Sequence, residues 1–202
     1  ELPVWVNDFN ANDFPAKYMN KSWNLDTAKS LYIQSTEDDV PFEGNIMGEA
    51  GVVFPHQLDN IKTSRNEAFK TTPFANTFTF DFAKAVVKNE QLGNNSVPDF
   101  LTVSISSTDY IGHTFGPNSM EIEDTYLRLD KDIADFLQYL DKAVGKDNYL
   151  FFLTSDHGVA HVPAFLNQHA IPAGVVDVAG LLNKMNQLVQ YNFGVEKAIT
   201  TI

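Results

Sequence analysis

Two apolar runs constrain the fold of this chain more than any other feature of its sequence. The first covers residues 100–106 and the second residues 148–155. Nearly continuous apolar runs of this length are typical of strands that are covered on both faces. A helical apolar stripe between residues 119 and 140 separates them, with Gly145 as a stop signal. Strand, helix and strand in this order predict a parallel α/β sheet.

Each run leads to a carboxylate and an imidazole. Asp109 and His113 follow the first run, separated by a segment that Gly112 is expected to fold into a tight turn, and Asp156 and His157 follow the second. Because ligand sites in such sheets form beyond the carboxyl ends of the strands, the four side chains are expected to meet at one sheet edge. Carboxylate oxygens and imidazole nitrogens are ligands that zinc binds well.

Each pair taken alone also has a plainer interpretation. Asp109 could cap a helix with His113 on the surface, and Asp156 could be a turn carboxylate with His157 as a packing residue. A single Asp-x-x-x-His spacing is a weak metal signal. The occurrence of two such pairs, each after a predicted buried strand, favours a two-metal site.

The composition limits the ligands and partners of such a site. The chain contains no cysteine, so metal ligands must come from His, Asp or Glu. Its net charge is −12 at pH 7, which disfavours nucleic acid as a partner. A phosphate ester would need local positive charge, for which bound divalent cations are the obvious source. Apolar runs are all shorter than the roughly 18 residues of a membrane-spanning helix, so no span is predicted.

The chain divides into a less regular and a more regular part. Residues 1–72 are rich in aromatic and turn-forming residues and predict an irregular cap or insertion. Residues 73–202 predict the α/β part that carries the metal ligands, with further helices at residues 75–91 and 178–191. Because the chain begins at Glu1 and not at Met, we expect it to be a piece of a longer protein.

The spacing around these ligands resembles a known family. Asp-x-x-Gly-His-x-x-Gly-Pro, which begins at Asp109, and Asp-His-Gly, which begins at Asp156, are similar to motifs of the alkaline phosphatase superfamily, in the branch of type I phosphodiesterases and nucleotide pyrophosphatases. The wider sequence most resembles the bacterial PafA-type alkaline phosphatases, over most of the chain but more loosely in the first 70 residues. The segments that carry this resemblance are LPVWVNDFNA, TPFANTFTFDFAKAV, SSTDYIGHTFGPNS and FLTSDHGVAHVP.

The resemblance implies part of a three-layer α/β sandwich with parallel strands and a two-zinc site. In the family, one zinc is held by the residues that match Asp109 and His113 plus a later His, and the other by those that match Asp156 and His157 plus an upstream Asp. The nucleophilic Thr and the residues that hold the phosphoryl group match positions before the first residue of this chain, and the later His matches a position beyond its last. No catalytic residue is therefore assigned within the chain.

The resemblance further implies that the intact parent protein is a periplasmic or secreted, zinc-dependent hydrolase of small phosphate monoesters. This chain, completed by the remainder of the parent, would supply part of the site; alone we expect it to bind zinc weakly and to have negligible activity. A nucleotide pyrophosphatase/phosphodiesterase is one alternative, and a metal-free α/β module that binds a partner through its first 70 residues is another. His161 is expected to lie in a loop or behind the ligands, and His56 and His169 on the surface.

Overall fold

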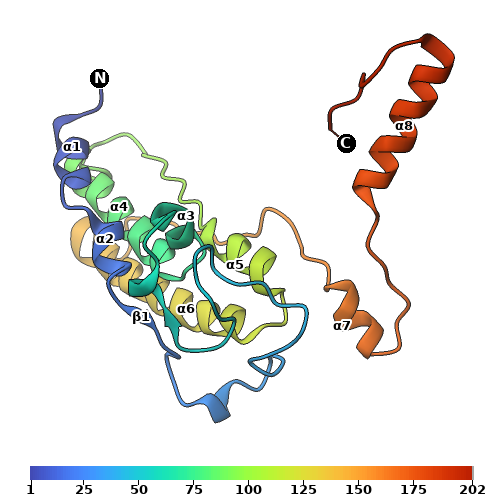
Figure 1. Ribbon diagram of the computed structural model, residues 1–202. Coiled ribbons are helices and arrows are strands. Elements are labelled where there is room, and N and C mark those ends of the chain that lie inside the picture. The colour runs from blue at the N-terminus through green and yellow to red at the C-terminus, as the bar shows by residue number, and fades with distance from the viewer. Residues whose placement is uncertain (202) are drawn as a thin grey trace. The chain divides into compact units, whose positions relative to one another are not determined.

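The computed structural model describes residues 1–201 of the chain. They form two compact units, one that covers Glu1–His161 and one that begins at Val162 (Figure 1). The helices of the first unit are α1 (Val4–Asn10), α2 (Phe14–Tyr18), α3 (Arg65–Lys70), α4 (Phe74–Asn89), α5 (Ser107–Phe115) and α6 (Met120–Leu140), and its strands are β1 (Ser22–Trp23) and β2 (His56–Gln57). The second unit contains α7 (Pro163–Gln168) and α8 (Val178–Phe193). The predicted boundary between residues 72 and 73 stays a prediction.

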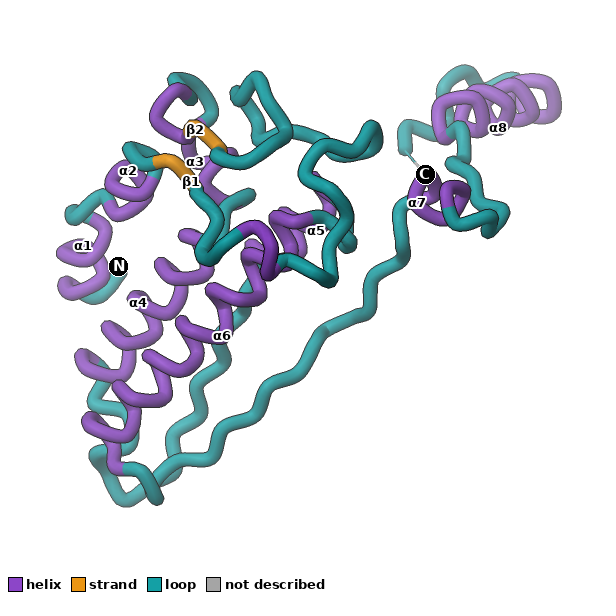
Figure 2. Tube along the Cα trace, turned by 90° about the horizontal axis from the view of Figure 1, so that it is seen from below, coloured by secondary structure: helices purple, strands orange, loops and turns teal. Residues whose placement is uncertain are grey.

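Helices α4 and α6 pack side by side and form the framework of the first unit (Figure 2). α6 begins where the sequence predicts it, because the Ser119 side chain accepts a hydrogen bond from the backbone N–H of Ile122 at 3.2 Å. Phe80 and Ala83 of α4 pack against Phe136 of α6 in a small apolar core. A short π-helical turn, Asp141–Gly145, follows α6 and ends at Gly145, whose φ is +102°.

A second and larger core lies where the first 72 residues pack against α5 and the start of α6. Trp23, Ile61, Ile111 and Phe115 are all fully buried in it. Trp23, Tyr32 and Phe69 of the predicted cap are buried, and each large ring excludes water from a considerable apolar area. The first segment is packed through these rings although it has little regular secondary structure.

A buried carboxylate ties the same segment to α6. Asp124, which is fully buried, accepts hydrogen bonds from Trp23 Nε1 at 2.6 Å, from Tyr32 Oη at 2.5 Å and from the backbone N–H of Asp26 at 2.7 Å. Arg128, one turn further along α6, donates to the same carboxylate at 2.6 Å. Charge-assisted hydrogen bonds of this kind satisfy a group whose burial would otherwise be costly.

The two predicted strands are where the structure differs from the sequence prediction. Within residues 1–201 the sheet consists of β1 and β2 alone, paired antiparallel with Trp23 opposite His56. Residues 100–106 and 148–155 run as extended chain without strand pairing and are drawn as loop in Figure 2. A buried parallel strand needs hydrogen-bonding neighbours at its edges, and the described residues provide none for these two runs. As a result Phe100 is 92% and Phe152 79% exposed.

The second unit is helical. α8 covers Val178–Phe193, close to the predicted range, and begins where Asp177 accepts a hydrogen bond from the N–H of Gly180 at 2.9 Å. It ends at Gly194, whose φ of +66° is the left-handed conformation that glycine adopts without strain. Among the helices in the described part of the chain, none combines the length and apolar character that crossing a membrane requires.

Candidate metal centre

Helix α5 carries the first pair of predicted ligands. The structure corrects the tight turn expected at Gly112: the segment is helical from Ser107 to Phe115, and it ends at Gly116, whose φ is +93°. Asp109 lies in the first turn and His113 in the last, where a helix dipole favours a carboxylate and an imidazole respectively. Because the two are four positions apart, they share one exposed face, with His113 Nε2 3.4 Å from Asp109 Oδ2.

The opposite face of α5 is anchored in the protein. Ser107 Oγ lies 2.6 Å from the backbone oxygens of both Lys70 and Thr72, to which it can donate. Asn76 of α4 donates from Nδ2 to Thr108 Oγ1 at 3.1 Å. These contacts fix the N-terminal turn of the helix, so the direction in which Asp109 projects follows from buried packing.

The second pair follows the extended run of residues 148–155. The backbone N–H of His157 donates to Asp156 Oδ1 at 3.0 Å, and His157 Nδ1 lies 2.9 Å from the Gly158 carbonyl oxygen. The Gly158 carbonyl, and then the charges of Asp156 and Asp109, raise the pKa of His157. Its Nε2 faces Asp156 Oδ2 at 3.7 Å and Asp109 Oδ1 at 3.9 Å.

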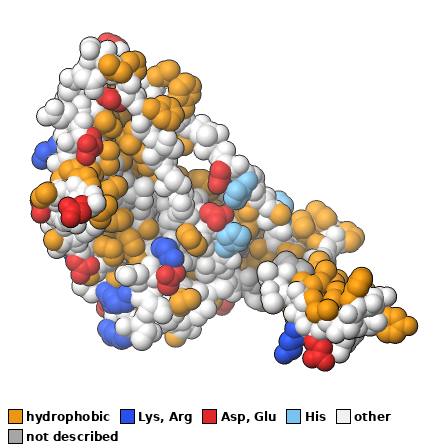
Figure 3. Space-filling model, turned by 90° about the horizontal axis from the view of Figure 1, so that it is seen from above, with side chains coloured by type: hydrophobic (Ala, Val, Ile, Leu, Met, Phe, Trp, Pro, Cys, Tyr) orange, Lys and Arg blue, Asp and Glu red, His pale blue; other side chains and the backbone are white. Residues whose placement is uncertain are grey.

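The structure thus brings His113 and His157 together around Asp109, and Asp156 faces the same Nε2 atom of His157. One oxygen of Asp109 faces the Nε2 atom of His113 and the other faces the Nε2 atom of His157. Figure 3 shows imidazole and carboxylate side chains gathered next to one another on one face of the molecule. All four residues are exposed, so they are open to a ligand from solvent.

The chemistry of these donors fits a divalent cation such as zinc. A metal-binding histidine usually donates its second ring N–H to a backbone carbonyl or a carboxylate, which is how Nδ1 of His157 is placed against Gly158. Within residues 1–201, no three His, Asp or Glu side chains are placed to hold a single ion. The fit is therefore to two incomplete donor sets, because catalytic zinc generally has three protein ligands.

Two other histidines lie near the ends of loops. His161 Nδ1 is 2.7 Å from Asn118 Oδ1, in the loop that joins α5 to α6. His169 is exposed and its Nδ1 lies 2.8 Å from the backbone oxygen of Phe165. Both positions agree with the loop and surface locations expected for these two residues.

His56 is not on the surface, contrary to the prediction. It is fully buried, with Nδ1 2.9 Å from Glu49 Oε2 and Nε2 3.2 Å from Glu121 Oε1. Its ring packs against Trp23 and Phe115 at centroid distances of 5.0 and 5.2 Å. Burial alone would lower the pKa of His56, but the hydrogen bonds to the two carboxylates and their charges outweigh it and raise the pKa to about 9.

The sequence offered little indication of this buried cluster. The sequence FPHQ around His56 suggested a turn, and Glu121 and Asp124 looked like first-turn acids that favour a helix dipole. Glu121 and Asp124 lie beside Ile122 and Thr125 on the face of α6 that the core covers, and all four are buried. The closeness of these two acids to core residues is the sequence feature that could have indicated their burial.

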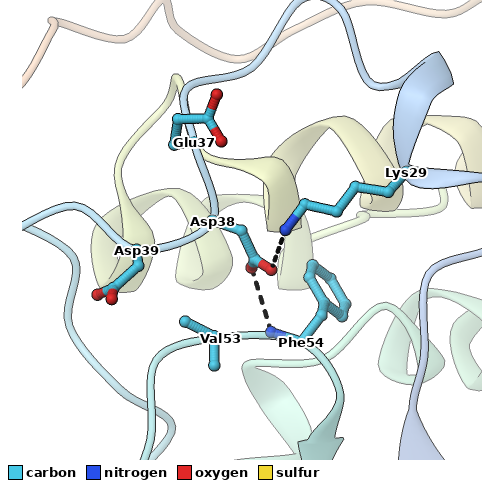
Figure 4. A pocket seen from close by; sticks show the side chains of 6 residues that line it. All are labelled: Lys29, Glu37, Asp38, Asp39, Val53 and Phe54. Atoms are coloured by element: carbon cyan, nitrogen blue, oxygen red, sulfur yellow. Dashed lines mark hydrogen bonds and ion pairs between the residues drawn. The ribbon is translucent and has the colours of Figure 1, made fainter.

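A pocket of about 310 Å³ is lined by residues of the first segment, separate in sequence from the ligand pairs. Figure 4 shows Asp38 at its centre, accepting hydrogen bonds from Lys29 Nζ at 2.8 Å and from the backbone N–H of Phe54 at 3.1 Å. Glu37 and Asp39 complete its acidic lining. Such a lining repels anions, so the pocket is unsuited to a phosphate ester.

Comparison with known proteins agrees with this picture. Residues 3–192 match the family described as type I phosphodiesterase / nucleotide pyrophosphatase. The chain is 50% identical over 174 residues to alkaline phosphatase PhoV of Synechococcus elongatus, which covers 86% of this chain and 32% of that protein. It is 44% identical over 200 residues to alkaline phosphatase PafA of Elizabethkingia meningoseptica, which covers 98% of this chain and 36% of that protein.

The fold is also that of a solved relative. A crystal structure of wild-type alkaline phosphatase PafA superimposes with a TM-score of 0.88 at 44% identity, over 97% of this chain and 37% of that one. The predicted class, a partial alkaline-phosphatase-like α/β fold, is therefore confirmed, although the two apolar runs are unpaired in the described residues. The chain spans about a third of the length of the curated relatives that it matches.

Proposed function

This chain belongs to the type I phosphodiesterase / nucleotide pyrophosphatase family, and we propose that the intact parent protein hydrolyses small phosphate monoesters at a site that holds two zinc ions. The observation that carries the proposal is the position of Asp109, whose two carboxylate oxygens face the imidazoles of His113 and His157. The names of its relatives, alkaline phosphatases PhoV and PafA, favour monoesters as substrates.

Each residue of the site has a separate part in this proposal. Asp109 and His113 would hold one ion, and Asp156 and His157 the other. When bound, the two ions would supply positive charge that offsets the charge of the phosphoryl group. The two aspartates reduce the net charge of the loaded site, which limits how tightly product phosphate is retained. The contact of the Gly158 carbonyl with Nδ1 of His157 orients the ring so that its Nε2 atom faces Asp109 and Asp156.

For the 202-residue chain alone we propose a non-catalytic role. Its site offers two donors for each ion, fewer than the three that catalytic zinc generally takes from protein, and no nucleophile is assigned within it. The chain should therefore bind zinc loosely and should not turn over a substrate. We also propose that the parent acts in the periplasm or outside the cell, as the resemblance to PafA-type enzymes implies.

A nucleotide pyrophosphatase/phosphodiesterase remains a second candidate, because the matched family is named for that activity. The metal-free binding module has less support, since rings in the first segment such as Trp23 and Phe69 are 0% and 5% exposed and unavailable to a partner. Comparing p-nitrophenyl phosphate with bis-p-nitrophenyl phosphate separates the two enzymes. A parent protein that prefers the diester would overturn the monoesterase proposal.

His157→Ala tests the metal site itself. We expect this change to weaken zinc binding markedly in calorimetry of the 202-residue chain, because the ion assigned to Asp156 and His157 loses one of its two donors. In the parent it should lower kcat/KM by at least ~100-fold, since even the loss of a group behind a ligand costs ~10–100-fold. His169→Ala, which removes another exposed histidine, should leave both measurements unchanged. Unchanged zinc affinity in His157→Ala would refute the site.

A further inference from the structure

A hydrogen bond links the two ligand-bearing segments. His161 Nδ1 lies 2.7 Å from Asn118 Oδ1, across 43 positions of sequence. We propose that Asn118 and His161, here termed the 118–161 clasp, are positioning residues that hold the turn of Asp156 and His157 over helix α5. The inference rests on the proposed function in assigning these side chains to a metal site, but its geometric part can be tested without metal.

One end of the clasp is fixed by the surrounding structure. The backbone oxygen of Asn118 accepts hydrogen bonds from the N–H of Thr36 at 2.8 Å and from Thr36 Oγ1 at 3.1 Å. The next residue, Ser119, is 2% exposed and caps α6. On the other side, Phe115 is fully buried at the end of α5. Asn118 therefore presents its side chain from a loop held at both ends.

The segment that leads to His161, at the other end of the clasp, is held less firmly than the loop of Asn118. Residues 150–157 are exposed and have no strand partner within residues 1–201, so little packing holds the turn in place. The Nε2 atom of His157 lies 3.9 Å from Asp109 Oδ1 of α5, a distance too long for a hydrogen bond. His161 follows His157 by four residues, which span at most about 14 Å when fully extended. Fixing His161 therefore confines His157 to the neighbourhood of Asp109.

A direct metal ligand is the alternative role for His161. A ligand and a positioning residue make different predictions about Asn118. If His161 acts through the clasp, removing either partner breaks the same hydrogen bond, so the second substitution adds little to the first. If His161 binds the ion itself, Asn118→Ala costs little, and its effect adds to that of His161→Ala.

The metal-free test uses the absence of cysteine from the chain. Tyr110→Cys on α5 and Val159→Cys beside the turn, 44% and 71% exposed, allow two spin labels to be attached to the 202-residue chain. Double electron–electron resonance measures the distance between the two labels. We expect a narrow distribution of this distance when the clasp is intact, and a broad one in His161→Ala and in Asn118→Ala. His161→Asn, whose amide N–H replaces Nδ1–H, should restore the narrow distribution, and His169→Ala is the matched control. An unchanged distribution in both alanine variants would overturn the clasp.

Zinc binding provides a second test of the clasp. We expect His161→Ala and Asn118→Ala each to weaken zinc binding about 10-fold, the lower end of the effect of groups behind a ligand, and the double variant to bind like either single one. Additive losses would show that His161 acts independently of Asn118 and would overturn the proposal. If the unaltered chain binds no zinc, the proposed metal site fails, and the spin-label distances still decide whether the clasp exists. Circular dichroism checks that every variant is folded.

Discussion

At the scale of single residues, the imidazole of His56 is a fully buried group that depends on charged partners. It is enclosed with Glu49 and Glu121 in a core of aromatic rings, and one oxygen of Glu121 has no hydrogen-bond partner among the described residues. The side chain of Glu43 is close enough for its charge to matter: burial, and then the charge of Glu121, raise the pKa of Glu43 to about 7. An imidazolium is what allows so many carboxylates to share this space.

This cluster makes stability depend on pH. The pKa of His56 rises from 6.5 to about 9 on folding, so its stabilising contribution is complete below pH 6.5 and is lost as pH rises through about 9. The pKa of Glu43 rises from 4.5 to about 7, so its contribution is lost as pH rises from about 4.5 through 7. Both effects lower the free energy of unfolding toward alkaline pH, by about 3 kcal/mol for His56 alone.

Urea titrations between pH 6 and pH 10 measure this loss. At pH 6 the free energy of unfolding of His56→Gln should already be lower by ~3–5 kcal/mol, because the variant leaves buried carboxylates without a cation. Above pH 7 the free energy of unfolding of this variant should fall little further. His169→Ala should retain the slope of the unaltered chain. If His56→Gln does not fold, the NMR titration of His56 in the unaltered chain decides: a pKa at or below 6.5 would contradict the cluster.

The location of His56 could not be predicted from its neighbours in sequence. Its burial depends on Glu49, seven positions away, and on Glu121, 65 positions away. Only the tertiary structure brings those charges together. Asp109, His113, Asp156 and His157 were more accessible to prediction, because a short sequence motif marks each pair.

At the scale of elements, the long amphipathic helices were predictable, whereas the short helix α5 and the strands were not. The predicted helix at 75–91 corresponds to α4 (Phe74–Asn89), and the one at 178–191 to α8 (Val178–Phe193). A helix satisfies its hydrogen bonds internally, so its apolar period and end signals are contained in the local sequence. A strand depends on partners elsewhere, and residues 100–106 have none within the described chain.

Helix α5 shows how tertiary contacts decide between two local conformations. Gly112 and Pro117 suggested a turn, but Ile111 and Phe115 bury one helical face completely. That burial favours the helix despite the cost of glycine in its interior, which is ~1 kcal/mol relative to Ala. Because this segment is helical, Asp109 and His113 lie one turn apart on the same face of α5.

The buried contacts at the start of α5 yield a test of this anchoring. Asn76→Ala removes the donor to Thr108, and Ser107→Ala removes the donor to Lys70 and Thr72. Ser107→Ala should lower the free energy of unfolding by about 1–3 kcal/mol, the cost of an unpaired buried group, and Asn76→Ala by about 1 kcal/mol, because its bond to Thr108 is only part-buried. Backbone amides of α5 should exchange hydrogen faster, while those of α4 stay protected.

A matched control is available on the same helix. Thr79 Oγ1 of α4 donates to the backbone oxygen of Ala75 one turn earlier, at 2.8 Å. Thr79→Ala should change stability by less than ~0.5 kcal/mol and leave exchange in α5 unaltered. Equal exchange rates in α5 for Asn76→Ala and the control would refute the anchoring role.

At the scale of the whole molecule, the exposed apolar runs and the acidic charge act in opposite directions. Leu150 and Phe152 are both 79% exposed on extended chain whose backbone N–H and C=O groups have no strand partner in the part of the chain that the structure describes. Such an edge readily pairs with another chain. The net charge of −12 opposes association, and this repulsion weakens as salt shortens the screening length.

We therefore expect the 202-residue chain to self-associate in sedimentation velocity, more strongly at high salt, and to enhance the fluorescence of an apolar dye. The double variant Leu150→Lys, Phe152→Lys should be monomeric and bind less dye, because it places two cations on the unpaired edge. Val4→Lys, Ile33→Lys makes the same change in charge at two other sites that are 75% exposed, and should associate as the unaltered chain does. Association that persists in the first variant, or disappears equally in the second, would show that the runs are not the surface responsible.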